Sequence, residues 1–466
     1  MKIEGIKYSA AVCCVTLGQL IFPGCTQKKP NIIFILADDL GYHQVGAFGG
    51  GSFYETPNIN SLAKEGIRFT NAYAAAPVSS PTRGSIMTGK YPARTNLTVN
   101  LPAKYDSKKL NTAPFSNMLS ESEVTIAEIL KENGYKTGHF GKWHLNVDKD
   151  YQPDRPGDPE SQGFDEVLHT EKPSGYAVNT KGSDWHNTDK ITQRSISFIE
   201  RNRDKPFFCY VSYNAIHRPE LERDEMVVKY RGKEDADNDD EYGFNNPVQA
   251  AMLETMDKGI GTIIQKVADL GISDNTVIVF FSDNGQLRNR KDAIYFRGSK
   301  ADLYEGGIRM PLVIKWSKII EPGTTSNEMV ISTDFFPTLC ELAGIDKLPK
   351  DIDGISLVPV LKDADAKLDR DAIYWHFPHY HGLGIEPQGA IRMGKYKLVE
   401  NFNKSLFNEP GGWELFDLES DPKESINIVD KLPDITNKLK NELQIWRQSV
   451  AAQMMTINPD YENTTK

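Results

Sequence analysis

The stretch that best defines the fold reads NIIFILADD and spans residues 31–39. Residues 31–37 form a continuous apolar run of strand length, typical of a parallel strand that is buried on both faces. Asp38 and Asp39 follow directly, at the end of the strand where open α/β sheets place ligands. Paired buried charges are costly unless a cation or hydrogen bonds hold them. The stretch therefore predicts an α/β sheet with a metal site at its edge; the alternative is an Asp pair that caps a turn.

A second motif reads SSPTR over residues 79–83 and continues GSIMTG over residues 84–89. Residues 84–88 are predicted to form the first turns of a helix, so Ser79 lies at a junction between a loop and a helix. A helix N-terminus offers backbone N–H groups to an anion. The alternative interpretation is a turn rich in Ser and Pro with an ordinary capping serine.

Three more predicted strands, at residues 136–140, 206–213 and 277–281, also lead into polar residues. In one doubly wound sheet their carboxyl ends lie along the same edge, so we expect the residues that follow them to converge. These residues are Lys142 with His144, His217, and Asp283 with Asn284.

The length and charge of the chain narrow the possible functions. With 466 residues, two domains are expected. The net charge of −10 argues against a nucleic-acid partner, and it implies that a local basic cluster must attract any anionic substrate. Cys209 and Cys340 are expected to be buried apolar residues and not a disulfide framework.

The N-terminus is predicted to be a signal peptide over residues 1–24. It has a basic start and an apolar segment that is too short to span a bilayer. Residues 22–25 resemble a bacterial lipobox, which makes Cys25 the lipidated N-terminus; plain secretion is the alternative. In both cases we expect an exported protein, either periplasmic or anchored in the outer membrane of a bacterium.

Residues 25–365 are expected to form the catalytic α/β domain, a large doubly wound mixed sheet flanked by helices. The pattern then changes to short runs joined by turns, which predicts a smaller α+β subdomain at residues 366–456 with a short antiparallel sheet and a closing helix. Residues 457–466 are expected to be a disordered tail.

Taken together, these features resemble the formylglycine-dependent sulfatases of the alkaline-phosphatase-like superfamily. The motif Cys/Ser-x-Pro-Ser/Thr-Arg, followed after four residues by Thr-Gly, is similar to the sulfatase signature, and its first residue falls on Ser79. The resemblance covers nearly the whole chain after residue 30. It implies a hydrolase of sulfuric esters in which residue 79 is oxidised to formylglycine.

The resemblance also implies a role for each residue of the site. One Ca²⁺ ion would be held by Asp38, Asp39, Asp283, Asn284 and the formylglycine at position 79. Arg83 and Lys142 would orient the formylglycine hydrate, and Lys300 would bind a sulfate oxygen. His217 would face the leaving oxygen, and His144 would help to release the sulfated intermediate. Ligands that are all oxygen atoms suit Ca²⁺ better than zinc or Mg²⁺.

Three alternative functions would each require a different set of site residues. A phosphatase or phosphodiesterase of the same superfamily would use two zinc ions and several histidine ligands, which the carboxylate set disfavours. A non-catalytic glycan-binding lipoprotein would need a broken site, and a structural or adhesive protein predicts no convergent set. Ser79 stands where many family members carry Cys; either an anaerobic radical enzyme matures this Ser, or it is an engineered replacement that leaves the protein inactive.

Two segments are candidates for contact with the substrate: WHFPHYH at residues 375–381 and GAIR at residues 389–392. In the family such loops reach over the active site, which makes His376, His379, His381 and Arg392 candidate substrate-binding residues; a structural turn around Pro378 is the alternative. The chain is similar to bacterial carbohydrate sulfatases, which implies a sulfated saccharide, with 4-sulfated galactose or N-acetylgalactosamine as examples. Expected partners are that saccharide and a formylglycine-generating enzyme, with no nucleic acid and no membrane contact except through Cys25.

Overall fold

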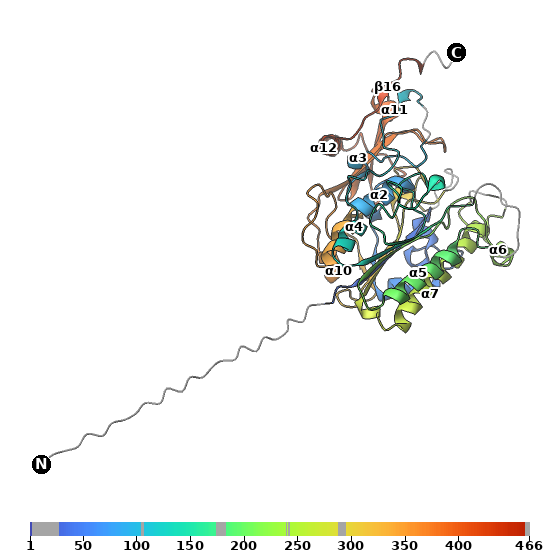
Figure 1. The fold of residues 1–466 in the computed structure, drawn as a ribbon. Coiled ribbons are helices and arrows are strands. Elements are labelled where there is room, and N and C mark those ends of the chain that lie inside the picture. Colours follow the sequence, from blue (N-terminus) through green and yellow to red (C-terminus); the bar gives the residue numbers. More distant parts are fainter. Residues whose placement is uncertain are drawn as a thin grey trace.

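The computed structural model describes residues 1, 28–103, 107–173, 183–238, 240, 243–287 and 295–461 (Figure 1). Nearly all of the expected signal peptide, Cys25 and the last five residues of the expected tail lie outside this set. Among the described residues, no helix combines the length and apolar character that a membrane crossing requires.

The fold is built on a mixed central sheet of eight strands, in which the apolar run at residues 31–37 forms a buried strand with parallel neighbours, as predicted. The strand β1 (Asn31–Ala37) lies between two parallel neighbours, β7 and β8. The strand β9 runs antiparallel to β8 and to β2, which makes the sheet mixed. In spatial order the strands are β10 (Thr324–Ser326), β2 (Ile67–Phe69), β9 (Leu312–Lys315), β8 (Thr276–Ser282), β1, β7 (Phe207–Ser212), β5 (Lys136–Gly141) and β6 (Glu166–His169).

Helices cover both faces of this sheet, because both faces of β1 are apolar. Ile33 and Ile35 pack in one buried cluster with residues of α1, α5 and α7, and α5 and α7 lie side by side in Figure 1. Phe34 and Leu36 point the other way, into a cluster with residues of α2, α4 and α9. The larger helices are α1 (Pro57–Glu65), α2 (Ser79–Thr88), α4 (Ile126–Glu132), α5 (Thr188–Asn202), α6 (Asp224–Arg231), α7 (Pro247–Asp269) and α9 (Phe335–Leu342).

Short elements connect these layers. They are the strand pair β3 (Ala72–Tyr73) and β11 (Val330–Ile331), the helices α3 (Pro92–Thr95), α8 (Glu305–Ile308), α10 (Val358–Lys362) and α11 (Phe402–Ser405), and the 3₁₀ turns η1 (Tyr42–Gln44), η2 (Gly46–Phe48), η3 (Asp148–Asp150), η4 (Ser273–Asn275) and η5 (Ser332–Asp334). The chain reaches α4 through a capping box: Thr125 N–H donates to Glu128 Oε2 at 2.8 Å, and Glu128 N–H donates to Thr125 Oγ1 at 3.2 Å.

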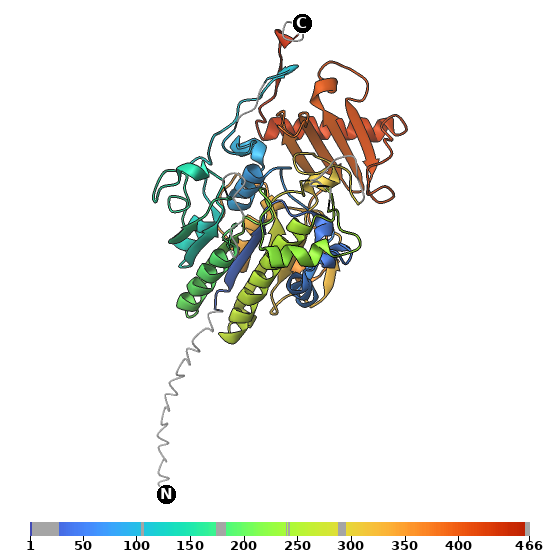
Figure 2. The same cartoon turned by 90° about the vertical axis from the view of Figure 1, so that its right-hand side faces the viewer.

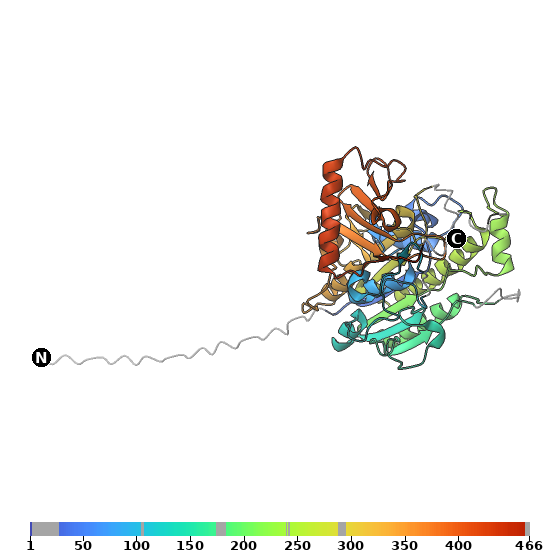
Figure 3. The ribbon, with the colours of Figure 1, turned by 90° about the horizontal axis from the view of Figure 1, so that it is seen from above.

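The C-terminal part forms a second, smaller sheet beside the first (Figure 2). Its four strands, β12 (Ala372–Phe377), β13 (Gln388–Met393), β14 (Tyr396–Asn401) and β15 (Trp413–Asp417), pair antiparallel in chain order. The closing helix α12 (Pro433–Ser449) lies along one face of this sheet (Figure 3). It buries Leu439 and Leu443 in one cluster with Trp375.

The expectation of a disordered tail from residue 457 is wrong for its first residues. Thr456–Ile457 form the strand β16, which pairs antiparallel with β4 (Leu110–Asn111). The backbone N–H of Asn458 continues this pairing with a bond to Lys109 O at 3.1 Å. The polar sequence of the tail does not predict this strand, because the strand forms only by pairing with a segment more than 300 residues earlier in the chain.

Candidate active site

The carboxyl ends of four adjacent parallel strands, β8, β1, β7 and β5, meet at one edge of the central sheet. Main-chain hydrogen bonds continue beyond the strand ends. Asp38 N–H donates to Ala215 O, and Lys142 N–H donates to Ser212 O, both at 2.9 Å. The sheet therefore extends into the segments that carry the expected site residues.

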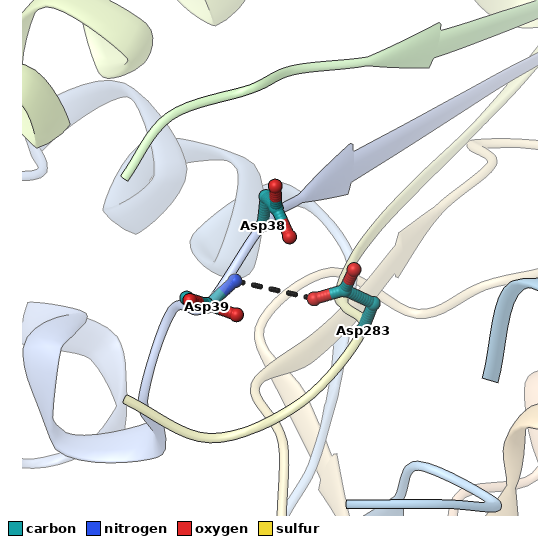
Figure 4. A group of neighbouring side chains, drawn as sticks. All are labelled: Asp38, Asp39 and Asp283. Atoms are coloured by element: carbon teal, nitrogen blue, oxygen red, sulfur yellow. Dashed lines mark hydrogen bonds between the residues drawn. The ribbon is translucent and has the colours of Figure 1, made fainter. Parts of the chain in front are cut away.

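Three carboxylates lie together at this edge (Figure 4). Asp38, Asp39 and Asp283 are at most 3% exposed, and one oxygen of each lies within 4.8 Å of the others. Asp39 has a φ of 63°, and its backbone N–H donates to Asp283 Oδ1 at 3.2 Å. The structure thus brings together the three acidic residues that the sequence predicts as metal ligands.

The pKa values of these carboxyl groups differ because their neighbours differ. Burial raises the pKa of Asp283 to about 6, and the nearby Asp38 adds to the rise. Burial also acts to raise the pKa of Asp38, but the surrounding cations, Lys142 foremost, outweigh it and hold that pKa well below its usual range. Of the three carboxyl groups, Asp283 is therefore the one whose pKa is raised, while those of Asp38 and Asp39 are lowered.

Ser79 is the first residue of α2 and lies against this cluster. Its buried hydroxyl is 3.2 Å from Asp38 Oδ1 and 3.1 Å from Asn284 Oδ1. The Asn284 amide nitrogen donates to Asp39 Oδ1 at 2.8 Å, which leaves its oxygen turned toward Ser79. The side chains of Ser79 and Asn284 therefore join the carboxylates around one centre, as predicted.

Arg83 lies one turn further along α2 and is 1% exposed. Its Nε and Nη2 contact Asp283 Oδ2 at 2.9 and 2.7 Å, and its Nη1 donates to Ser212 Oγ at 2.6 Å. Arg83 thus contacts the carboxylate cluster on the side of Asp283. Its expected role in orienting residue 79 stays a prediction.

Two lysines complete the positive side of the site. Lys142 Nζ donates to Asp38 Oδ2 at 2.7 Å, and Lys300 Nζ donates to the two oxygens of Asp39 at 2.6 and 2.8 Å. Burial acts to lower the pKa of Lys300, but the surrounding carboxylates, Asp39 foremost and then Asp38, together outweigh it and the pKa is raised. Both lysines are therefore held at the site by its carboxylates.

The two predicted catalytic histidines have different partners. His217 Nε2 is 3.7 Å from Asp39 Oδ2, and its Nδ1 is 2.5 Å from Arg218 O. Burial, with a contribution from Lys300, lowers the pKa of His217 to about 3. His144 Nε2 is 2.6 Å from Leu101 O. Burial and then Lys142 hold the pKa of His144 well below its usual range.

The donor set fits a hard divalent cation. Three carboxylates and one amide supply only oxygen atoms, as Ca²⁺ prefers, and they are already gathered around the Ser79 hydroxyl. The charges of Asp38, Asp39 and Asp283 are matched by those of Arg83, Lys142 and Lys300. A bound divalent cation would therefore leave an excess of positive charge that an anionic ligand could neutralise.

The four predicted substrate-binding residues have contacts with residues outside the carboxylate cluster. His376 Nε2 is 2.8 Å from Gln453 O, and the ring of His379 lies between the hydroxyls of Thr98 and Thr112 at 2.8 and 2.9 Å.

Arg392 Nη1 contacts Asn71 Oδ1 at 3.1 Å and also the hydroxyl of Tyr73, while His381 is partly exposed beside its bridge to Ile385. His376, His379 and Arg392 are thus buried and bonded to other parts of the protein. Substrate contact by the set of four stays a prediction.

Other residues support the site but carry no recognisable sequence motif. Gln249 of α7 accepts hydrogen bonds at its Oε1 from the side chains of Gln44 and Gln286, both at 3.1 Å. It thereby ties the segment after Asp39 to the segment after Asn284. Leu101 contributes its backbone: His144 contacts its carbonyl, and its N–H donates to Ser80 Oγ at 3.1 Å. A helical glutamine and a backbone carbonyl give no signal in the sequence, because their partners are distant in the chain.

The chain is similar in sequence and in structure to known proteins. Residues 30–345 match the family model described as Sulfatase, and residues 296–449 match that of the N-sulphoglucosamine sulphohydrolase C-terminal region. The chain is 30% identical to a sulfatase of Formosa agariphila, with 90% of this chain and 89% of that protein covered. It is 27% identical to the N-acetylglucosamine-6-O-sulfatase of Bacteroides thetaiotaomicron, with coverage of 99% and 94%. The crystal structure of Ps i-CgsB in complex with k-i-k-neocarrahexaose aligns with a TM-score of 0.74 and 28% identity, over 90% of this chain and 93% of that one.

Proposed function

The chain belongs to the sulfatase family and is therefore a sulfuric ester hydrolase, and from this premise we propose that its substrate is a sulfated saccharide. Two similar proteins support the substrate class: one is named N-acetylglucosamine-6-O-sulfatase, and the other was solved in complex with k-i-k-neocarrahexaose. Units of 4-sulfated galactose or N-acetylgalactosamine are the first candidates.

The observation that carries the proposal is the position of Ser79. Its hydroxyl lies within 3.2 Å of Asp38 and Asn284, at the N-terminus of α2 and among three cationic side chains. At such a position a nucleophile can attack an anionic group, because the helix N-terminus and the cationic side chains offset the negative charge of that group.

Two groups are proposed to complete the site. Formylglycine formed from Ser79 supplies a carbon with two hydroxyls, one of which serves as the nucleophile, and a Ca²⁺ ion offsets charge on the sulfuryl oxygens. Asp38, Asp39, Asp283 and Asn284 would hold the ion. Lys142 and Lys300 would bind the sulfuryl oxygens. A divalent cation would replace them as the positive partner of Asp38 and Asp39, so both ammonium groups could pair with the sulfate.

His144 is suited to accept a proton. A carbonyl oxygen only accepts hydrogen bonds, so the contact with Leu101 O puts the proton of the neutral ring on Nε2 and leaves the lone pair on Nδ1. The lowered pKa keeps the ring neutral. We therefore assign Nδ1 of His144 as the base that takes a hydroxyl proton at position 79.

His217 has the opposite arrangement. Its Nδ1 donates to Arg218 O, so Nε2 carries a proton only when the ring is positively charged. A sulfate ester bound beside Nε2 favours that charge. His217 is thus the proposed acid that protonates the leaving sugar oxygen.

A screen of defined sulfated saccharides tests the proposed function. The Ser79→Cys variant, co-expressed with a formylglycine-generating enzyme, should release sulfate from at least one of them, and Ser79→Ala should release none. Metal analysis of the same protein should find calcium. Two zinc ions per chain, together with release of phosphate from phosphate esters, would support the phosphatase alternative instead.

We also propose that the protein is exported and anchored through a lipid on Cys25. The support is the basic and apolar N-terminal sequence with its lipobox-like residues 22–25. Labelled palmitate should be incorporated into the full chain but not into its Cys25→Ala variant. Labelling of neither protein, with secretion intact, would indicate plain secretion.

A further inference from the structure

Lys300 lies on a closed loop, residues 297–307, here called the Lys300 loop. Gly306 N–H donates to Arg297 O at 2.7 Å and closes it, while Lys300 N–H donates to Gln286 O at 3.0 Å. The loop has no internal space: a Cβ atom at Gly306 would come within 2.3 Å of Gly298 O, and one at Gly307 within 2.0 Å of Asp302 O. The loop is therefore tightly packed, and Lys300 is joined through it to both of its ends.

The C-terminal sheet holds this loop at several points. Arg297 contacts Glu414 of β15 with both terminal nitrogens at 3.2 Å, and its Nη1 also donates to Glu424 O at 3.2 Å. On the other side of Lys300, Leu303 N–H donates to Gln388 Oε1 of β13 at 2.9 Å. Both sides of the loop are thus bonded to the small sheet.

A buried ionic group lies at the end of the loop. Lys397 of β14 contacts Glu305 Oε1 at 3.0 Å and Glu424 Oε1 at 2.8 Å, and all three side chains are 0% exposed. The Glu305 backbone N–H also donates to Glu424 Oε2 at 2.7 Å. Charges this deeply buried tolerate little displacement, because each loses its partner when it moves.

We propose that the C-terminal sheet positions Lys300 in the active site. By holding Arg297, Leu303 and Glu305, it sets where Lys300 Nζ meets a sulfuryl oxygen. Glu414 and Gln388 are positioning residues, since they act through the loop. The inference rests on the proposed function, in which Lys300 binds sulfate. It gives the C-terminal sheet a role in sulfate binding that is separate from any contact with the sugar.

A double-mutant cycle between Glu414→Ala and Lys300→Ala tests the proposal. Glu414 is 23% exposed, so its replacement should leave the fold intact. Because a misplacement of about 1 Å can cost roughly 10²-fold in rate, we expect Glu414→Ala to lower kcat/KM by about 10-fold. In the Lys300→Ala background the same change should cost less than about twofold, since the residue on which Glu414 acts is gone. Asp417→Ala is the matched control: Asp417 lies on the same strand but pairs with Lys395 at 2.7 Å, away from the loop.

The cycle is measured a second time, as the Kd for inorganic sulfate by calorimetry on the Ser79→Ala protein, which needs no maturation. Additive effects in both cycles, or an equal loss in Asp417→Ala, would overturn the inference. If no sulfate ester is turned over, the proposed function fails, and the sulfate-binding cycle still decides whether the sheet positions Lys300. If Glu414→Ala does not fold, Gln388→Met replaces it, with the same expected coupling.

Discussion

Replacing Asp283 with asparagine removes one charge from the carboxylate cluster and keeps the shape of the side chain. The pKa of Asp283 is about 6 in the fold, against an ordinary value of 3.8. Since a tenfold change in an equilibrium is worth about 1.4 kcal/mol, ionised Asp283 destabilises the metal-free fold by roughly 3 kcal/mol above pH ~6. That penalty fades as the pH falls from about 6 to 3.8, because the carboxyl group is then protonated in the folded protein.

The asparagine still accepts a hydrogen bond from Arg83, whose Nη2 also lies 3.6 Å from Asp38. We therefore expect Asp283→Asn to raise the free energy of unfolding in a chelator by roughly 1–3 kcal/mol near pH 7.5, and by almost nothing near pH 4. With Ca²⁺ at about 100 times its Kd, the parent protein should gain about 2.7 kcal/mol and the variant far less.

The assay is urea unfolding with EDTA or with CaCl₂ at both pH values. Asp257→Asn is the matched control, because Asp257 is also a fully buried acid but is bonded to Asn58 and Ile59 away from the cluster. It should keep the full response to calcium. The reasoning is refuted if Asp283→Asn is less stable than the parent protein in EDTA at the higher pH. Equal responses to calcium in parent and variant would refute the metal site.

Four further outcomes are expected. The His217→Ala variant should lose about 10²–10⁴-fold in rate on a sugar sulfate and much less on an aryl sulfate, whose leaving group needs no proton. Equal losses in rate on both substrates would show that His217 is not the acid. His144→Ala should penalise both substrates alike in the same kinetic assay. Mass spectrometry of the active enzyme should show the residue 79 peptide lighter by two hydrogens, and full turnover by protein with unmodified Ser79 would contradict the mechanism. Thr125→Ala should lower the free energy of unfolding by about 1 kcal/mol through loss of the cap on α4, with kcat unchanged.

Several parts of the molecule follow from local sequence. The apolar run of β1 must be buried on both faces, so the helices on each side of the sheet could be predicted before any contact was known. The capping box at Thr125 and the helix over residues 84–88 are likewise local, because their hydrogen bonds join residues within one turn. The structure begins this second helix earlier than predicted, at Ser79. The convergence of Asp38, Asp39 and Asp283 follows from one rule about parallel strand ends.

Tertiary structure decided the features that depend on partners distant in the chain. The carbonyl of Leu101 sets the tautomer of His144, and the bonds of Arg297 and Leu303 to the small sheet hold the loop of Lys300. His379 lies in an aromatic segment that suggests sugar binding, and no pattern in the sequence indicates the two threonine hydroxyls between which its ring lies. Residue type and spacing show which groups can form a hydrogen bond. Only the packing of the two sheets determines which partner each group meets.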